Sequence, residues 1–115
     1  MKLFDIFKSK RDYSSLTSEQ KRKLIEKGEL KPLYLIALRF GGSDGMDNMV
    51  YAPAAAVDLK NKIDDELEEF MNQGRAVKGY RCIPSYKGKS GIPTRIVIQA
   101  FIDGFEQFVR DINIW

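Results

Sequence analysis

The residues with the clearest chemical character lie between positions 75 and 95, where basic and aromatic side chains alternate and no acidic residue occurs. Positive charge attracts phosphate and carboxylate groups, and exposed aromatic rings stack on the bases of single-stranded nucleic acid. The segment is therefore a candidate binding surface. Its candidate residues are Lys78, Tyr80, Arg81, Tyr86, Lys87, Lys89 and Arg95. The alternative is that one aromatic face packs on a helix while the lysines keep the other face in water.

Catalytic groups are scarce in this chain. It has no His and one Cys, which removes Ser-His-Asp and Cys-His nucleophile pairs. Gly88-Lys89-Ser90 matches the end of a phosphate-binding loop, but position 83 is Ile where that motif requires Gly. We expect Cys82 to be a small strand residue and not a nucleophile. The sequence predicts a protein that is not an enzyme and that uses no cofactor.

Two groups of acidic residues could in principle act as metal ligands or as acid–base pairs. Asp44 and Asp47 lie in a glycine-rich stretch, but position 55 is Ala where an EF-hand calcium loop closes with Glu. The carboxylates at 64–69 belong to a predicted amphipathic helix, so most of them should face water. The sequence therefore predicts no metal site.

Composition and charge describe the molecule that must carry these groups. The chain has 115 residues, 43% of them hydrophobic, and a net charge of +3, which is typical of one globular domain spanning 1–115. The charge is divided into blocks, about −4 over 54–74 and about +6 over 75–95. No apolar run of membrane-spanning length and no signal peptide occurs. With a single thiol, these features predict a cytoplasmic protein.

The first thirty residues divide into two segments. Residues 1–15 form an amphipathic N-terminal segment, with Leu3, Phe4 and Phe7 at helical spacing. We expect it to dock on its own domain; the alternative is contact between residues 1–11 and a membrane surface. Residues 16–30 are expected to be a short helix, capped by Thr17 with Gln20 at the capping-box position and stopped by Gly28.

Residues 31–115 are expected to form a sheet-and-helix core. Leu33–Phe40 is almost continuously apolar and predicts a central strand buried on both faces, with a short strand at Met49–Ala52 returning beside it. A long amphipathic helix is predicted from Ala54 to Gln73, because its apolar residues recur every three or four positions. A hairpin of 76–86 and 94–102 should follow.

The last segment has two interpretations. Phe105, Phe108, Val109 and Ile112 match helical spacing, which favours a C-terminal helix, whereas residues 112–115 would also suit a terminal strand. The complete fold class is then α+β: a mostly antiparallel sheet of three to four strands, packed by one long helix, with a shorter N-terminal helix and a C-terminal helix.

Parts of the chain resemble two nucleic-acid-binding families. Residues 33–38 resemble the first-strand motif of RNA-recognition motif domains, and Lys78-Gly79-Tyr80 resembles the opening of their third-strand motif. However, Lys78 follows the long helix directly, on the second strand, and Arg81 and Cys82 depart from that motif. The order of elements from Tyr51 to the hairpin is loosely similar to the second half of HIRAN domains, a DNA-binding family, without any matching functional residue.

These observations lead to one main functional hypothesis. The chain is expected to be a small, non-enzymatic protein-interaction domain that binds through charged surfaces. Nucleic-acid binding through the hairpin at 75–95 is the alternative. The sequence leaves a homodimer open, as well as the exposure of Tyr80 and Tyr86 on which the alternative depends.

Overall fold

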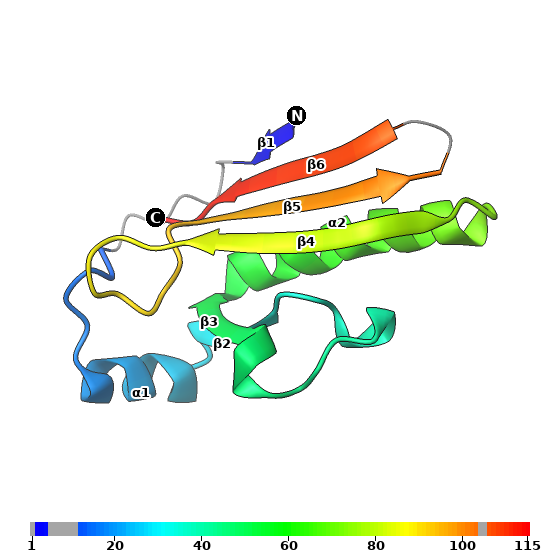
Figure 1. Cartoon of the computed structure of the whole chain (residues 1–115). Coiled ribbons are helices and arrows are strands. Elements are labelled where there is room, and N and C mark those ends of the chain that lie inside the picture. Colours follow the sequence, from blue (N-terminus) through cyan, green and yellow to red (C-terminus); the bar gives the residue numbers. More distant parts are fainter. Residues whose placement is uncertain (1, 5–11, 104–105) are drawn as a thin grey trace.

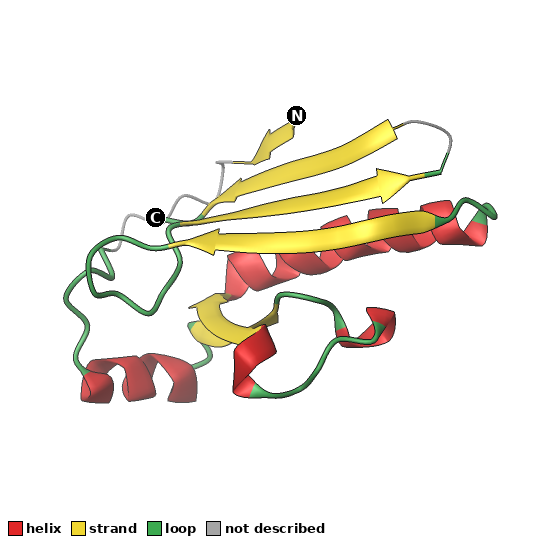
Figure 2. Cartoon of the chain, in the orientation of Figure 1, coloured by secondary structure: helices red, strands yellow, loops and turns green. Residues whose placement is uncertain are grey.

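A long helix lies against one face of an open sheet, and none of the helices that the structure describes lies on the other face (Figures 1 and 2). The computed structural model of the chain describes residues 2–4, 12–103 and 106–115. The elements in chain order are β1 (Lys2–Phe4), α1 (Ser18–Glu26), β2 (Leu30–Tyr34), β3 (Met49–Pro53), α2 (Ala54–Asn72), β4 (Val77–Ser85), β5 (Arg95–Ile102) and β6 (Glu106–Asn113).

The strands form two sheets. The larger has four strands in the order β1-β6-β5-β4, in which β4, β5 and β6 are antiparallel and β1 pairs parallel with β6. The smaller contains β2 and β3, paired antiparallel. The α+β fold class is confirmed, as are the predicted helix of α2 and the hairpin of β4 and β5.

The main core lies between α2 and the larger sheet. Alternate residues of β5 face the helix and are buried, as expected for a strand with one face on the core. They meet the apolar stripe that the spacing of α2 predicted. The buried apolar members of these two elements are Ala56, Leu59, Ile63, Leu67, Ile96, Ile98, Ala100 and Ile102.

A second, smaller core lies under α1. The helix begins with the predicted capping box, in which Thr17 Oγ1 accepts a hydrogen bond from Gln20 N at 3.1 Å and Gln20 Oε1 accepts one from Thr17 N at 2.9 Å. Leu24 of α1 is buried together with Tyr13, Leu30 and Ile92. α1 therefore covers its own small cluster and not the large sheet.

The prediction of a C-terminal helix is wrong. Residues 106–113 form β6, which pairs along its length with β5, placing Phe108 opposite Ala100 and Ile112 opposite Ile96. Phe108 and Ile112 are four residues apart, and residues at this spacing share one face both in a helix and in a strand. The pattern alone therefore does not distinguish a helix from a strand. The unpaired edge of β5 decides the outcome, because its backbone groups need partners.

The predicted central strand at Leu33–Phe40 is also wrong. β2 ends at Tyr34 and pairs only with β3, and Leu38–Phe40 is a single 3-10 turn. The backbone N–H and C=O of Ile36 bond to the side chain of Asn48 instead of a neighbouring strand. A side chain thus replaces the strand partner that the apolar run had suggested.

The short N-terminal helix expected within 16–30 is confirmed as α1, but the helical spacing of the segment 1–15 does not produce a helix where the structure describes that segment. Lys2–Phe4 is a strand, β1, because its backbone pairs with Arg110, Asp111 and Ile112 of β6. The rest of that segment lies outside the described residues, and so do most of the residues, 1–11, to which the alternative of a membrane contact applies. Among the helices that the structure describes, none is sufficiently long and apolar to cross a membrane.

Candidate interaction surfaces

The side of the larger sheet that faces away from α2 is the first candidate, and we call it the outer sheet face. Its side chains come in rows across the strands, because β4, β5 and β6 are in register. Phe101 is 61% exposed and Ile83 37% exposed. The face comprises Lys78, Arg81, Ile83, Arg95, Val97, Gln99, Phe101, Gln107 and Val109, with Asp111 at its β6 edge.

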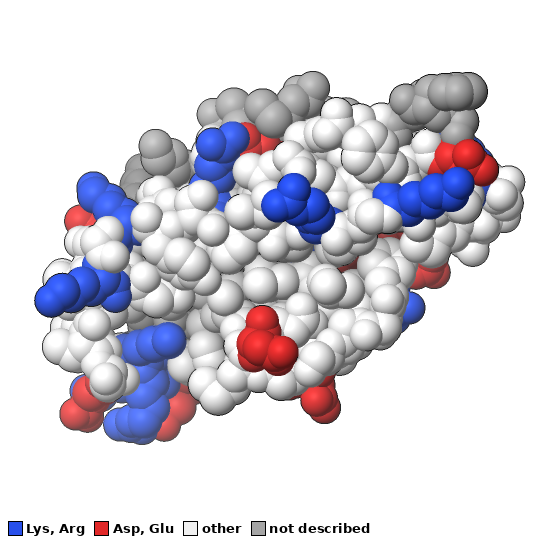
Figure 3. All heavy atoms as spheres, viewed as in Figure 1, with Lys and Arg blue, Asp and Glu red and all other residues white. Residues whose placement is uncertain are grey.

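Two cations on the outer sheet face have no partner among the residues that the structure describes. Lys78 is paired across the strands with Phe101, and Arg81 with Gln99, and both basic side chains are exposed. Arg95 differs, because its guanidinium forms an ion pair with the buried carboxylate of Asp111. Figure 3 shows Lys and Arg side chains separated by uncharged surface over the region that β4 and β5 occupy in Figure 1.

The remaining predicted cations lie in the connection between β4 and β5. Lys87 and Lys89 are exposed there, and the side chain of Tyr86 is 47% exposed. Gly88 adopts a φ of +60°, which a turn requires and which favours glycine. These residues lie beyond the end of the sheet at which Arg95 lies.

Tyr80 does not belong to this surface. It lies on the inner face of β4, and its hydroxyl is 3.1 Å from the carbonyl oxygen of Leu35 and 3.0 Å from Asp64 Oδ1. Its ring contacts Phe40 edge-on, with centroids 6.0 Å apart. Three of the seven predicted residues, Lys78, Arg81 and Arg95, thus lie on the outer sheet face. Tyr86, Lys87 and Lys89 lie in the connection that follows β4, and Tyr80 is part of the core.

Tyr80 belongs to a polar cluster between α2 and β4 that the sequence analysis missed. Lys60 and Asp64 form an ion pair, and both side chains are only 2% exposed. Asp64 thereby accepts one hydrogen bond on each oxygen, from Lys60 and from Tyr80. The sequence does contain a signal for the burial of Lys60 and Asp64. Positions 56, 60 and 64 are spaced four apart and form a row along the helix next to the apolar row at 59, 63 and 67, so that side chains in both rows point toward the core.

Cys82 lies next to this cluster. Burial raises the pKa of its thiol to about 12, an effect that Lys60 opposes and Asp64 reinforces. Burial, followed by the charge of Asp64, also raises the pKa of Tyr80. Both groups therefore stay protonated at neutral pH, which makes the thiol a poor nucleophile.

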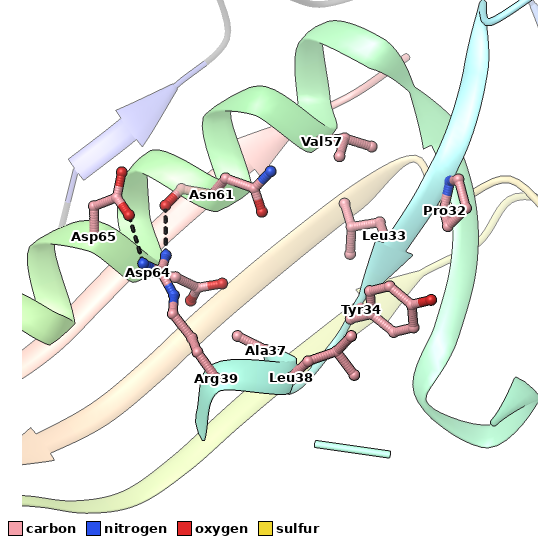
Figure 4. Close-up of a pocket in the computed structure, with 10 residues that line it drawn as sticks. All are labelled: Pro32, Leu33, Tyr34, Ala37, Leu38, Arg39, Val57, Asn61, Asp64 and Asp65. Carbon is pink, nitrogen blue, oxygen red and sulfur yellow. Dashed lines mark hydrogen bonds and ion pairs between the residues drawn. The ribbon is translucent and has the colours of Figure 1, made fainter. Parts of the chain in front are cut away.

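A cavity of about 440 Å³ lies between α2 and the segment that leads out of β2, and we call it the helix–loop cavity (Figure 4). Arg39 crosses its polar end, donating hydrogen bonds to Asp65 at 2.6 Å, Glu68 at 2.9 Å and the carbonyl oxygen of Asn61 at 3.0 Å. The lining residues are Pro32, Leu33, Tyr34, Ala37, Leu38, Arg39, Val57, Asn61, Asp64 and Asp65.

Metal binding finds no support in the described part of the chain, where no three His, Cys, Asp or Glu side chains are placed to hold an ion. The acidic residues of the loop before β3, Asp44 and Asp47, are exposed. Asn48, in the same stretch, uses its amide to bond Ile36 and Ser43. The amide of Asn48 therefore ties this loop to the segment that follows β2.

Comparisons with known proteins give a partial similarity to a secretion-system protein. No protein-family model matches this chain. Over 87 residues, 70% of the chain, it is 33% identical to the type VII secretion system protein EssD of Staphylococcus aureus strain USA300, and equally to EssD of strain NCTC 8325 / PS 47. The match covers 14% of the EssD sequence. The chain is thus similar to one portion of a much longer secretion-system protein.

Proposed function

We propose that this chain is a protein-binding domain that works without catalysis, and that its outer sheet face binds an acidic surface of a partner protein. One observation carries this proposal: Phe101 is exposed in an interior strand of an open sheet, beside Lys78 and Arg81, two cations that have no partner among the described residues. An aromatic side chain flanked by cations is typical of the anchor residues of protein interfaces.

A protein partner is favoured over a nucleic acid by what surrounds Phe101. Its cross-strand partners are Lys78 and Gln107, and the aliphatic residues of the face follow in the next two rows, Val109 first and then Val97 with Ile83. Phe101 is the face's one aromatic among the described residues. Single-stranded nucleic acids are usually held by several stacking rings. Of the two tyrosines that the nucleic-acid hypothesis invokes, Tyr80 packs against α2, and only Tyr86 is exposed, in the connection that follows β4.

The similarity to EssD supports a setting for this interaction. EssD is named as a type VII secretion system protein, and we extend that setting to the partner of this chain. We place the interaction in the cytoplasm, because a lone thiol such as Cys82 suits a reducing compartment. The absence of catalysis is supported by the protonated Cys82 and by the lack of His.

Photo-crosslinking in the native host tests the proposal. A benzoylphenylalanine introduced at position 101 is expected to form a discrete protein adduct, whereas the same group at the exposed position Gln73 should not. Reversing both cations, Lys78→Glu with Arg81→Glu, should lower the adduct yield about tenfold. Lys31→Glu, an exposed cation in the smaller sheet, is the matched control and should leave the yield unchanged.

Other outcomes are equally informative. An adduct that nuclease treatment removes would establish the nucleic-acid alternative. An adduct of twice the chain's mass would identify a second copy as the partner, in agreement with the homodimer that the sequence left open. Equal crosslinking at positions 101 and 73, or yields unaffected by reversing Lys78 and Arg81, would refute the proposed surface.

A further inference from the structure

The helix–loop cavity is a second candidate site, separate from the outer sheet face. It is lined by β2, by the turn that follows β2 and by α2, and by no residue of β4, β5 or β6. Its volume of about 440 Å³ lies within the range of roughly 300–1,000 Å³ found for small-molecule sites. The cavity is therefore large enough for a ligand of its own.

The lining is divided into two ends. Figure 4 shows Arg39, Asn61, Asp64 and Asp65 gathered at one end, and the side chains of Leu33 and Val57 at the other. Pro32 and the ring of Tyr34 complete the apolar end, and Leu38 lies at the rim, 48% exposed. A ligand that satisfies both ends must have an apolar body and a polar head.

The charged residues around the polar end of the cavity indicate whether the polar head of a ligand should be cationic or anionic. Two cations, Arg39 and Lys60, lie among three carboxylates, those of Asp64, Asp65 and Glu68. Arg39 is already shared between two of these carboxylates and a backbone carbonyl. It is therefore poorly suited to receive an anionic ligand, and the surplus charge is negative.

Asp64 has capacity that its present contacts do not use. A carboxylate offers about four acceptor positions. The two oxygens of Asp64 each accept one hydrogen bond, from Lys60 and Tyr80. Asp64 is buried and fixed by these contacts, and Figure 4 shows its carboxylate directed toward the space between Arg39 and Leu33. It is thus a preorganised acceptor for a donor that enters the cavity.

From these observations we propose that the helix–loop cavity binds a small organic cation, with a protonated amine at the Asp64–Asp65 end and an apolar body between Leu33 and Val57. A neutral apolar ligand would offer no donor to the remaining acceptor positions of Asp64 and would exclude water from them, which is unfavourable in a half-enclosed site. The proposal does not depend on the function of the outer sheet face.

The test uses three ligands of similar size that differ in charge: 2-phenylethylammonium, 2-phenylethanol and 3-phenylpropanoate. Each is titrated into the full-length, nitrogen-15-labelled protein, and amide chemical shifts are followed. The ammonium is expected to shift Ala37, Leu38 and Asn61, and to bind about fivefold more tightly than the alcohol. The propanoate should not saturate these sites.

Variants separate charge from shape. Asp65→Asn removes an exposed carboxylate at the rim and should bring the affinities of the ammonium and the alcohol to within about twofold. Asp58→Asn, an exposed residue of the same helix that does not line the cavity, is the matched control and should keep the fivefold preference. Val57→Phe fills the apolar end and should abolish binding of both ligands.

The proposal fails if the ammonium and the alcohol bind wild-type protein equally, or if the shifts lie outside the cavity. Failure of Val57→Phe to fold would not weaken the test, because Asp65→Asn alters a rim residue and the comparison of ligands uses the wild-type chain. Absence of any saturable shift with the ammonium overturns the proposal directly.

Discussion

Lys60 and Asp64 are the residues at which this fold departs most from an apolar core. Their side chains pair within α2 and are almost completely buried, and the hydroxyl of Tyr80 supplies the second contact to Asp64. Removing two charges from water costs several kcal/mol per ion unless the pair and its hydrogen bonds compensate. The pair therefore contributes little net stability while it is intact, and either ion is costly when left alone.

This asymmetry gives a prediction at the residue scale. Lys60→Met leaves a buried carboxylate with one neutral partner, so the free energy of unfolding should fall by about 3–5 kcal/mol. The double variant Lys60→Met with Asp64→Leu removes both charges and should recover most of that loss. Urea unfolding, followed by the fluorescence of the single tryptophan, Trp115, measures both.

An exposed pair on α1 provides the control. Arg22 and Glu26 have the same spacing in the chain, and their side chains are 57% and 60% exposed. Arg22→Met should therefore change the free energy of unfolding by less than about 0.5 kcal/mol. A cost for Lys60→Met as small as this would contradict the role given to the buried pair.

At the scale of elements, the connection between β2 and β3 depends on Asn48. Its side-chain oxygen accepts from the N–H of Ile36 at 2.8 Å, and its amide nitrogen donates to the carbonyls of Ile36 at 2.8 Å and Ser43 at 2.7 Å. Gly42 is packed tightly inside this arrangement. A side chain there would place Cβ 1.9 Å from the carbonyl oxygen of Ile36.

Gly42→Ala should therefore disrupt this loop. Because the obstructing atom belongs to the backbone, the loop must move, and we expect a loss of about 1–3 kcal/mol in the free energy of unfolding. Hydrogen exchange at the amide of Ile36 should accelerate in parallel. Gly91→Ala is the control, since the atom nearest to the added Cβ would be the flexible Nζ of Lys21 at 3.6 Å. Similar effects of the two changes would argue against the close approach.

The elements that could be predicted are those whose signals are local. The capping box of α1 and the apolar stripe of α2 depend on residues within a few positions of one another, and the hairpin is defined by its turn. β6 and the end of β2 were predicted wrongly because their partners are distant in the chain. Ile112 pairs with Ile96, and Ile36 bonds to Asn48, which no local pattern indicates.

At the scale of the whole molecule, Trp115 joins the two cores. Its ring contacts Tyr13 of the smaller core edge-on with centroids 5.8 Å apart, and its indole N–H donates to the carbonyl oxygen of Ile92 at 3.1 Å. It also packs against the main core. Loss of this side chain should therefore uncouple α1 from the sheet.

Trp115→Ala is expected to lower the free energy of unfolding by about 2–4 kcal/mol, because a large side chain shared by two cores is removed. Urea unfolding followed by circular dichroism measures this, since the variant has no tryptophan. Hydrogen exchange should accelerate more at Leu24 in α1 than at Ile98 in β5. Tyr86→Ala, a half-exposed aromatic outside both cores, should cost less than about 1 kcal/mol. Equal acceleration at Leu24 and Ile98 would mean that the molecule opens as one unit.

By itself the sequence determined the fold class, both helices and the position of the basic hairpin, because helix spacing, caps and charge runs are local properties. Only the tertiary structure decided which face of the sheet each basic or aromatic residue occupies. Side chains alternate between the two faces along β4, and the register shift between Lys78 and Tyr80 changes this alternation. As a result, Lys78 and Arg81 point away from α2, whereas Tyr80 points toward it. The choice between those faces depends on long-range packing, which also buries Lys60 with Asp64 and leaves Phe101 exposed.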